Sequence, residues 1–136
     1  MSFASYIGCN VEIPNNDDEY TEDFFYIGSC FAGEYEQLNV KKHQFTTPYV
    51  YEVSSHWGII ISEYTTPEIR SESKKKLLEL CNIMDSCLEK GDFFELYSCW
   101  VGEEAEEREG EIILQINNFD INLIEIPEKT LVRFEK

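Results

Sequence analysis

A large excess of acidic residues is combined in this chain with a high content of apolar residues. The 136 residues include 27 Asp and Glu against 11 Lys and Arg, a formal net charge of −16, yet 43% are hydrophobic and 14% are aromatic. A disordered acidic segment lacks that apolar content. We therefore expect a folded α+β protein with a strongly negative surface, which attracts basic partners and repels nucleic acids and anionic membranes.

The length is typical of a single domain, 1–136, that buries roughly two thirds of the surface of its unfolded chain. The number of cysteines is odd and no two of them form a CxxC pair: Cys9, Cys30, Cys81, Cys87 and Cys99. This pattern favours reduced thiols in the cytoplasm over a disulfide framework. No segment approaches the roughly 18 apolar residues of a membrane span, and residues 1–10 lack the basic and apolar regions of a signal peptide.

Aromatic and β-branched runs predict strands in the first and last thirds of the chain. The predicted strands are Phe3–Ile13, Phe24–Ile27, Pro48–Val53, Trp57–Tyr64, Phe93–Val101, Glu111–Ile116, Ile121–Ile126 and Thr130–Phe134. The short polar break at residues 54–56 predicts an antiparallel hairpin between the two strands around it. The polar segment Gly33–Gln44 is interpreted as a loop.

One helix is predicted from about residue 67 to residue 90. Thr66 is a typical N-cap, Pro67 suits the first helical position, and Gly91 is expected to end the helix as a left-handed C′ residue. Apolar residues recur at helical spacing at Leu77, Leu80 or Cys81, Met84 and Leu88. This stripe predicts a fold of the α+β class, in which a mainly antiparallel sheet of about six or more strands carries one principal helix on a face.

Glutamates are concentrated between Gly102 and Glu111, in a connection that two predicted strands hold in place. Carboxylates pair with arginine much as phosphates do, and an aromatic residue beside charge is typical of protein interfaces. Trp100 ends the preceding strand, where it is either an interface residue or a core residue. The predicted partner-binding residues are Trp100, Glu103, Glu104, Glu106, Glu107 and Glu109. A second acidic cluster at residues 17–23 is interpreted as a solvated loop.

No catalytic or metal-binding motif is recognisable. A calcium loop that starts at Asn15 or Asp17 would need glycine where Tyr20 or Glu22 stands. His43 and His56 have no cysteine at zinc-ligand spacing, and no nucleotide-binding glycine motif or nucleophile elbow occurs. We therefore expect no catalytic residues, no metal and no cofactor, although a pair of carboxylates for glycoside chemistry stays open.

The second half of the chain resembles small immunity proteins of bacterial polymorphic toxin systems, including contact-dependent inhibition. The similarity lies in the helix at residues 77–91, the aromatic strand Phe93–Tyr97, Cys99–Trp100 and the glutamate-rich connection. It implies a cytoplasmic protein that binds and neutralises a toxin domain, often a nuclease with a basic active-site cleft. It implies no defined set of binding residues.

The expected function is therefore that of an immunity protein, not an enzyme, which binds a basic cognate toxin domain through electrostatic and aromatic contacts. It binds neither nucleic acid nor a membrane. One alternative is a small enzyme that uses Asp or Glu in a pocket. Another is a phage-type nucleic-acid mimic, which ranks lower because the carboxylates gather in two loops. The oligomeric state is left open, and with it the alternative of an oligomeric scaffold.

Overall fold

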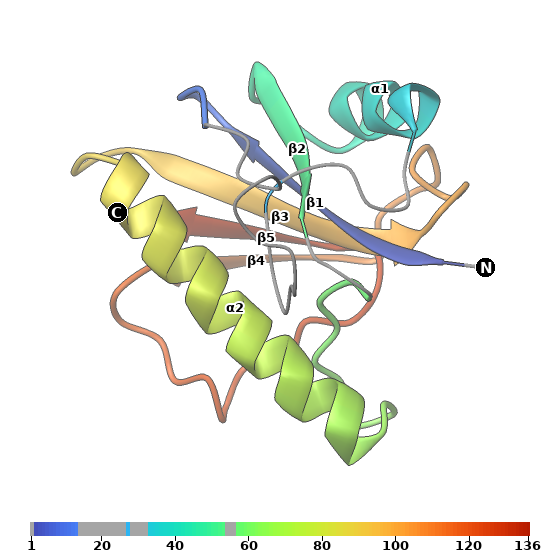
Figure 1. The fold of residues 1–136 in the computed structure, drawn as a ribbon, viewed down its shortest axis with the longest axis vertical. Helices are drawn as coiled ribbons and strands as arrows, with labels where there is room; N and C mark the ends of the chain where they lie inside the picture. The colour runs from blue at the N-terminus through green and yellow to red at the C-terminus, as the bar shows by residue number, and fades with distance from the viewer. Residues whose placement is uncertain (1, 14–26, 28–32, 54–56) are drawn as a thin grey trace.

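Five strands form one mixed sheet in the computed structural model, which describes residues 2–13, 27, 33–53 and 57–136. The strands are β1 (Phe3–Cys9), β2 (Tyr49–Val53), β3 (Phe93–Trp100), β4 (Gly110–Gln115) and β5 (Thr130–Glu135). Their order in space is β2-β1-β3-β5-β4, and every neighbouring pair is antiparallel except β4–β5, which is parallel (Figure 1). The helices are α1 (Glu34–His43) and α2 (Pro67–Cys87). The α+β class is confirmed.

Helix α2 begins as the sequence predicts. The Thr66 hydroxyl accepts a hydrogen bond from the Ile69 backbone N–H at 3.3 Å, and Pro67 follows the cap. The helix ends at Cys87, with Leu88 as C-cap, so the expected end at residue 90 is wrong. Gly91 does have a left-handed backbone (φ 97°), but it serves the turn into β3 instead of the helix terminus.

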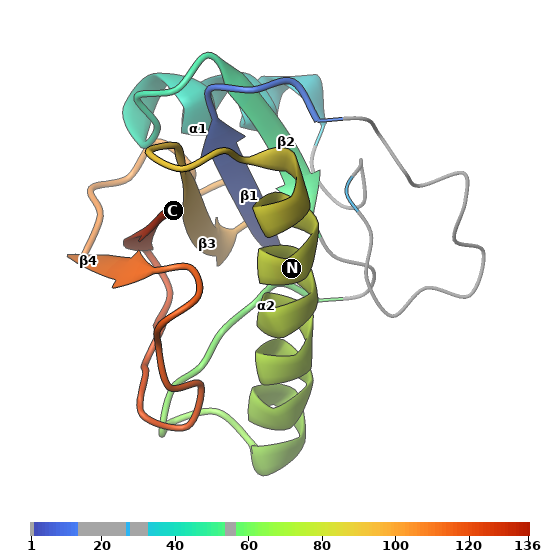
Figure 2. The same ribbon diagram turned by 90° about the vertical axis from the view of Figure 1, so that its left-hand side faces the viewer.

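The main core lies between α2 and one face of the sheet. Leu77, Leu80 and Met84 of α2 are fully buried in one cluster with Leu96 and Phe134 of the sheet. The connection between β4 and β5 lies beside the N-terminal half of α2 (Figure 2). Among the described residues, neither helix is long and apolar enough to cross a membrane.

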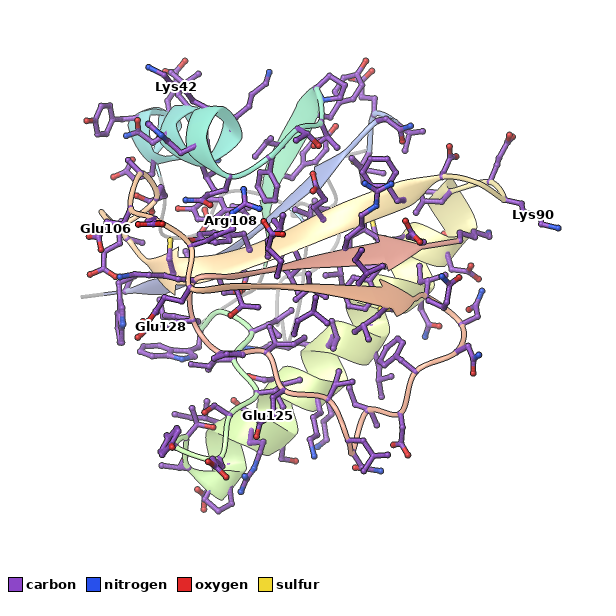
Figure 3. All side chains as sticks on the ribbon, turned by 180° about the vertical axis from the view of Figure 1, so that it is seen from behind. Lys42, Lys90, Glu106, Arg108, Glu125 and Glu128 are labelled. Atoms are coloured by element: carbon purple, nitrogen blue, oxygen red, sulfur yellow. The ribbon has the colours of Figure 1, made fainter. Side chains whose placement is uncertain are left out.

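The opposite face of the sheet is covered unevenly. Val40 of α1 and Phe45 pack with Tyr6 and Tyr97 over β1 and β3. Figure 3 shows β5 and β4 in front of α2 on this face, with α1 lying to one side of them. The exposed fraction of Ile113 in β4 is 66%, so the β4 end of the sheet presents apolar surface to solvent.

Helix α1 occupies the segment that was interpreted as a loop, and that prediction is wrong. Only Val40 of the helix is fully buried, so the apolar stripe that identifies α2 is missing here. Charge stabilises α1 instead, because Glu34 and Glu36 lie in its first turn and Lys41, Lys42 and His43 in its last turn. These charges complement the positive N-terminus and the negative C-terminus of the helix dipole.

Two of the predicted strands are also wrong. Residues 57–64 and 121–126 are joined by a single bridge, in which the Ile61 N–H donates to the Ile126 carbonyl at 2.9 Å and the reverse bond measures 2.7 Å. Backbone groups near Ile61 bond to side chains instead of a ladder, because the Ile59 N–H donates to the Ser5 hydroxyl and the Ile60 N–H to the Ser73 hydroxyl. Continuous apolarity here reflects burial and not strand pairing.

The predicted hairpin between residues 48–53 and 57–64 is therefore absent from the described part of the chain. Strand β2 pairs instead with β1, from Ser5↔Val53 to Cys9↔Tyr49. The described part holds five strands, not six or more. Residues 24–26 lie outside the described residues, and Ile27 forms an isolated bridge with Val53.

The close contact at Gly8 gives a first prediction about stability. A Cβ atom at Gly8 would collide with the Thr47 hydroxyl and would lie 2.8 Å from the Phe45 ring. We expect Gly8→Ala to lower the free energy of unfolding by about 2 kcal/mol, because the buried neighbours must shift. Urea denaturation measures the loss. Gly110→Ala is the matched control, since its Cβ would meet only Thr130 at 3.6 Å; equal stability losses would contradict the prediction.

Candidate acidic docking surface

The acidic loop, residues 101–109, is tied to the end of α1 by one buried glutamine. Gln44 Nε2 donates to the carbonyl oxygens of Glu104 at 3.1 Å and of Glu106 at 2.7 Å. In addition, Arg108 Nη2 donates a hydrogen bond to the Gln44 carbonyl oxygen at 2.9 Å. Because Gln44 is only 2% exposed, its side chain is shielded from water and ties the loop to the end of α1.

Lys129 fixes the other side of the acidic loop. Its Nζ lies 2.8 Å from Glu106 Oε1 and 3.4 Å from Glu103 Oε1. Its backbone N–H donates to the Ser98 carbonyl, and its carbonyl accepts from the Glu109 N–H, each at 2.7 Å. The hydrogen bond that Lys129 donates to Glu106, with the negative charges of both glutamates, raises the pKa of Lys129 well above its usual range. Two of the predicted docking carboxylates are thus partly neutralised within the molecule.

Glu104 lies inside the loop. Its carboxylate accepts from the Tyr6 hydroxyl at 2.8 Å and from the Gly102 backbone N–H at 2.9 Å, and the residue is 1% exposed. A partner protein cannot reach this carboxylate. Glu104 is therefore not a docking residue, contrary to the expectation from the sequence. It stabilises the loop from inside.

Burial keeps the groups around Glu104 protonated. Burial raises the pKa of the Tyr6 hydroxyl far above its usual range, and the hydrogen bond to Glu104 adds to this shift. The pKa of the Cys99 thiol is also raised, chiefly by burial and next by the negative charge of Glu104. Burial also raises the pKa of Cys81 to about 12 and that of Cys9 to about 11. The raised pKa values favour the protonated form of these groups at neutral pH, and a protonated thiol is a much weaker nucleophile than a thiolate.

Cys9, Cys81, Cys87 and Cys99 are free thiols, as expected, and Cys30 lies outside the described residues. Among the described residues, no group of three or more His, Cys, Asp and Glu is placed to hold a metal ion.

Trp100 belongs to an aromatic cluster at the end of β3. Its ring packs edge-on against Phe3 at a centroid distance of 5.3 Å and against Trp57 at 5.4 Å. Phe3 is buried, whereas both tryptophans are partly exposed. Trp100 is thus both a packing residue and a part of the surface beside the acidic loop.

A groove of about 660 Å³ continues from the acidic loop along the start of β4. We call it the acidic groove; its lining residues are Ile60, Ser62, Tyr64, Thr65, Glu109, Gly110, Glu111, Ile112, Glu125, Pro127, Glu128 and Thr130. Four of these are glutamates, and none of these described residues is Lys or Arg. Arg108, which is not among the lining residues, forms an ion pair with Glu111 at 2.7 Å. Glu109, Glu125 and Glu128 have no ion pair within the described part of the chain.

The structure brings together only some of the residues predicted from the sequence. Glu106, Glu107 and Glu109 are exposed, Glu103 is half-buried, and of these only Glu109 lines the acidic groove. The sequence reasoning missed Glu125 and Glu128, which the Ile61–Ile126 bridge places beside residues 60–65. Glu128 and Glu106 both lie near the start of β4 in Figure 3. A pairing of two such distant segments leaves no periodic signal in the sequence.

The hydrogen bonds of Gln44 give a second prediction. We expect Gln44→Ala to lower the free energy of unfolding by about 1–2 kcal/mol, because the buried Glu104 carbonyl and the partly buried Glu106 carbonyl lose their donor. Amide hydrogen exchange at Glu103 and Glu106 should accelerate more than exchange in α2. Gln37→Ala, a change of the same kind on α1, should leave these amides unchanged. Loop amides that exchange equally fast in both variants would show that Gln44 does not hold the loop.

Comparison with known proteins found no matching family model, no matching curated protein and no matching solved structure. Any statement about function therefore depends on the surface chemistry described above. The chemistry of that surface suits a positively charged group, because it combines several carboxylates with a hollow of about 660 Å³.

Proposed function

We propose that this protein is an immunity protein that binds and neutralises a cognate bacterial toxin domain, a nuclease with a basic active-site cleft, in the cytoplasm. The acidic groove carries this proposal. Carboxylates from two distant segments meet there, and three of them have no ion pair among the described residues. A set of unneutralised carboxylates along one groove favours a cationic partner and disfavours nucleic acid.

The chemistry of a nuclease makes it a suitable partner. Its cleft must attract phosphate groups, so it carries arginine and lysine side chains. Carboxylates accept the same paired hydrogen bonds from arginine that phosphates accept. An inhibitor that places Glu109, Glu125 and Glu128 against such a cleft would occupy the sites of the substrate phosphates.

Aromatic and apolar groups beside the glutamates would slow dissociation. Tyr64 lines the groove and is 91% exposed, and Ile60 and Ile112 lie in the same lining. Buried tyrosine and tryptophan contribute most to many interfaces, whereas exposed charges chiefly raise the association rate. Tyr64 is therefore the aromatic contact that we add to Trp100.

The proposal is tested by protection of cells. The open reading frame adjoining the gene of this chain is expressed from an inducible promoter, with and without this protein, and survival is counted. We expect wild-type protein to restore growth. The groove variant Glu109→Gln/Glu125→Gln/Glu128→Gln should protect poorly. The helix variant Glu72→Gln/Glu79→Gln/Glu89→Gln, which removes the same charge from exposed positions around α2, should protect fully.

Two results would contradict the proposal. One is an adjoining product that is not toxic, or that stays toxic beside soluble wild-type protein. The other is an equal loss of protection in the groove variant and the helix variant, because net charge alone would then explain the effect.

A further inference from the structure

Strand β4 is an edge of the sheet, and it lacks the lysine and proline residues that protect many edge strands. Edge strands of soluble proteins are generally covered, bulged, or interrupted by lysine or proline, because their free backbone groups pair with other chains. The sequence of β4 is Gly-Glu-Ile-Ile-Leu-Gln, without Lys or Pro, and Ile113 is 66% exposed. At the other edge, Val53 of β2 is bridged by Ile27.

The register shows which backbone groups of β4 face outward. The Ile116 N–H donates to the Glu135 carbonyl at 2.9 Å, directly after the parallel pairing of β4 with β5. Alternate residues of a parallel strand bond to the same neighbour, so Ile112 and Leu114 also face β5. Glu111, Ile113 and Gln115 consequently direct their N–H groups away from the sheet. Outside the strand ladders, no described residue accepts a bond from these three N–H groups.

The acidic groove runs beside this free edge. Residues 109–112, which lead into β4 and form its first half, line the groove together with Glu125 and Glu128. A chain added along β4 would direct every second side chain to the same face of the sheet. Side chains on one face would therefore enter a hollow that is rich in carboxylates.

The charge of the groove selects the occupant. A second copy of this chain would bring its own groove glutamates and a further −16 of net charge to the same edge. Like charges placed opposite each other on paired strands are destabilising. An extended segment with lysine or arginine at alternate positions meets the opposite charge instead.

We propose that a basic extended segment of the partner adds to β4 as a further strand and places lysine or arginine side chains in the acidic groove. The identity of the partner as a toxin rests on the proposed function above. The pairing itself depends only on the free edge of β4 and on the glutamates beside it. Main-chain hydrogen bonds would supply affinity, and the alternating cations would supply specificity.

A synthetic peptide of alternating arginine and valine, eight residues long with blocked ends, tests the pairing without any toxin. The probe is added to the ¹⁵N-labelled protein, and amide hydrogen exchange is followed by NMR. We expect exchange at Ile113 and Gln115 to slow by about tenfold or more at saturation, while Leu80 of α2 stays unchanged. A peptide with methylated central backbone nitrogens has the same charge and should bind about tenfold more weakly, because it cannot pair.

A protein variant gives an independent readout. Ile113→Pro removes an outward N–H and leaves the bonds from β4 to β5 in place, as prolines at sheet edges do. It should weaken binding of the unmethylated peptide by about tenfold. Ile113→Thr, which keeps the N–H and the branched side chain, should bind like the wild type.

Three outcomes would overturn the inference. The methylated peptide could bind as tightly as the unmethylated one, the peptide could bind without protecting Ile113 and Gln115, or the protein alone could protect them as its concentration rises. The last outcome would assign the edge to a second copy. Since no toxin enters these measurements, a failure of the survival assay leaves their result intact, and a failure here leaves the neutralising function intact.

Discussion

Replacing Glu104 by alanine is expected to lower the free energy of unfolding by about 3 kcal/mol. The substitution removes the acceptor of the Tyr6 hydroxyl and of the Gly102 N–H, and the Tyr6 hydroxyl is left buried without a partner. Alanine also leaves a small cavity under the acidic loop. The loss should appear in urea denaturation as a lower midpoint with an unchanged slope.

Two further variants separate the causes of this loss. Glu104→Gln keeps an oxygen that can accept both bonds and should cost less than half as much. Glu107→Ala removes an exposed glutamate of the same loop and should change stability by less than about 0.5 kcal/mol. A Glu104→Ala protein as stable as Glu107→Ala would show that the buried carboxylate does not anchor the loop.

The second large effect concerns association. We expect the groove variant to bind the toxin domain against which the wild type protects with an association rate at least about tenfold lower at low salt. Glu109, Glu125 and Glu128 line the same groove. Their negative potentials therefore add at the position that an approaching cationic cleft would take. The same charge removed from α2 lies away from that path.

Stopped-flow mixing at about 20 mM and about 500 mM salt measures the effect, because the screening length falls from about 20 Å to about 4 Å between them. The rates of wild type and groove variant should converge at high salt. The helix variant should follow the wild type at both concentrations. An unchanged association rate at low salt would remove the groove from the binding mechanism.

Much of the fold follows from local signals in the sequence. Helix α2 is marked by Thr66, Pro67 and a regular apolar stripe, and its structure agrees except at its C-terminal end. Strands β1, β2, β3, β4 and β5 coincide with aromatic or β-branched runs. These elements are predictable because their own residues determine both the backbone geometry and the buried face.

In two segments the local sequence pattern does not match the structure. Helix α1 buries only Val40, so its stabilising charges were interpreted as a loop. Residues 57–64 are as apolar as a strand, but Ser5 and Ser73 accept hydrogen bonds from their backbone. Tertiary contacts therefore override the local pattern in residues 57–64, whereas α1 depends on the charges at its own ends.

The site was predictable only in part for the same reason. A run of glutamates identifies the acidic loop but does not distinguish Glu104, which faces Tyr6, from Glu106 and Glu107, which face solvent. In a strand, side chains alternate between two faces, so burial can be predicted from position. The acidic loop is irregular, and its side chains do not alternate in this way. Glu125 and Glu128 join the site through chain topology alone.

Gln44 holds the acidic loop by the main-chain carbonyls of Glu104 and Glu106, not by exposed side chains. Every amino acid offers the same carbonyl oxygen, so the bonds from Gln44 can persist when Ala105 or Glu107 is exchanged. Substitutions at these outward positions would therefore change the surface of the loop without removing the bonds of Gln44 and Glu104. The molecule in this way separates the residues that preserve architecture from those that are free to diversify.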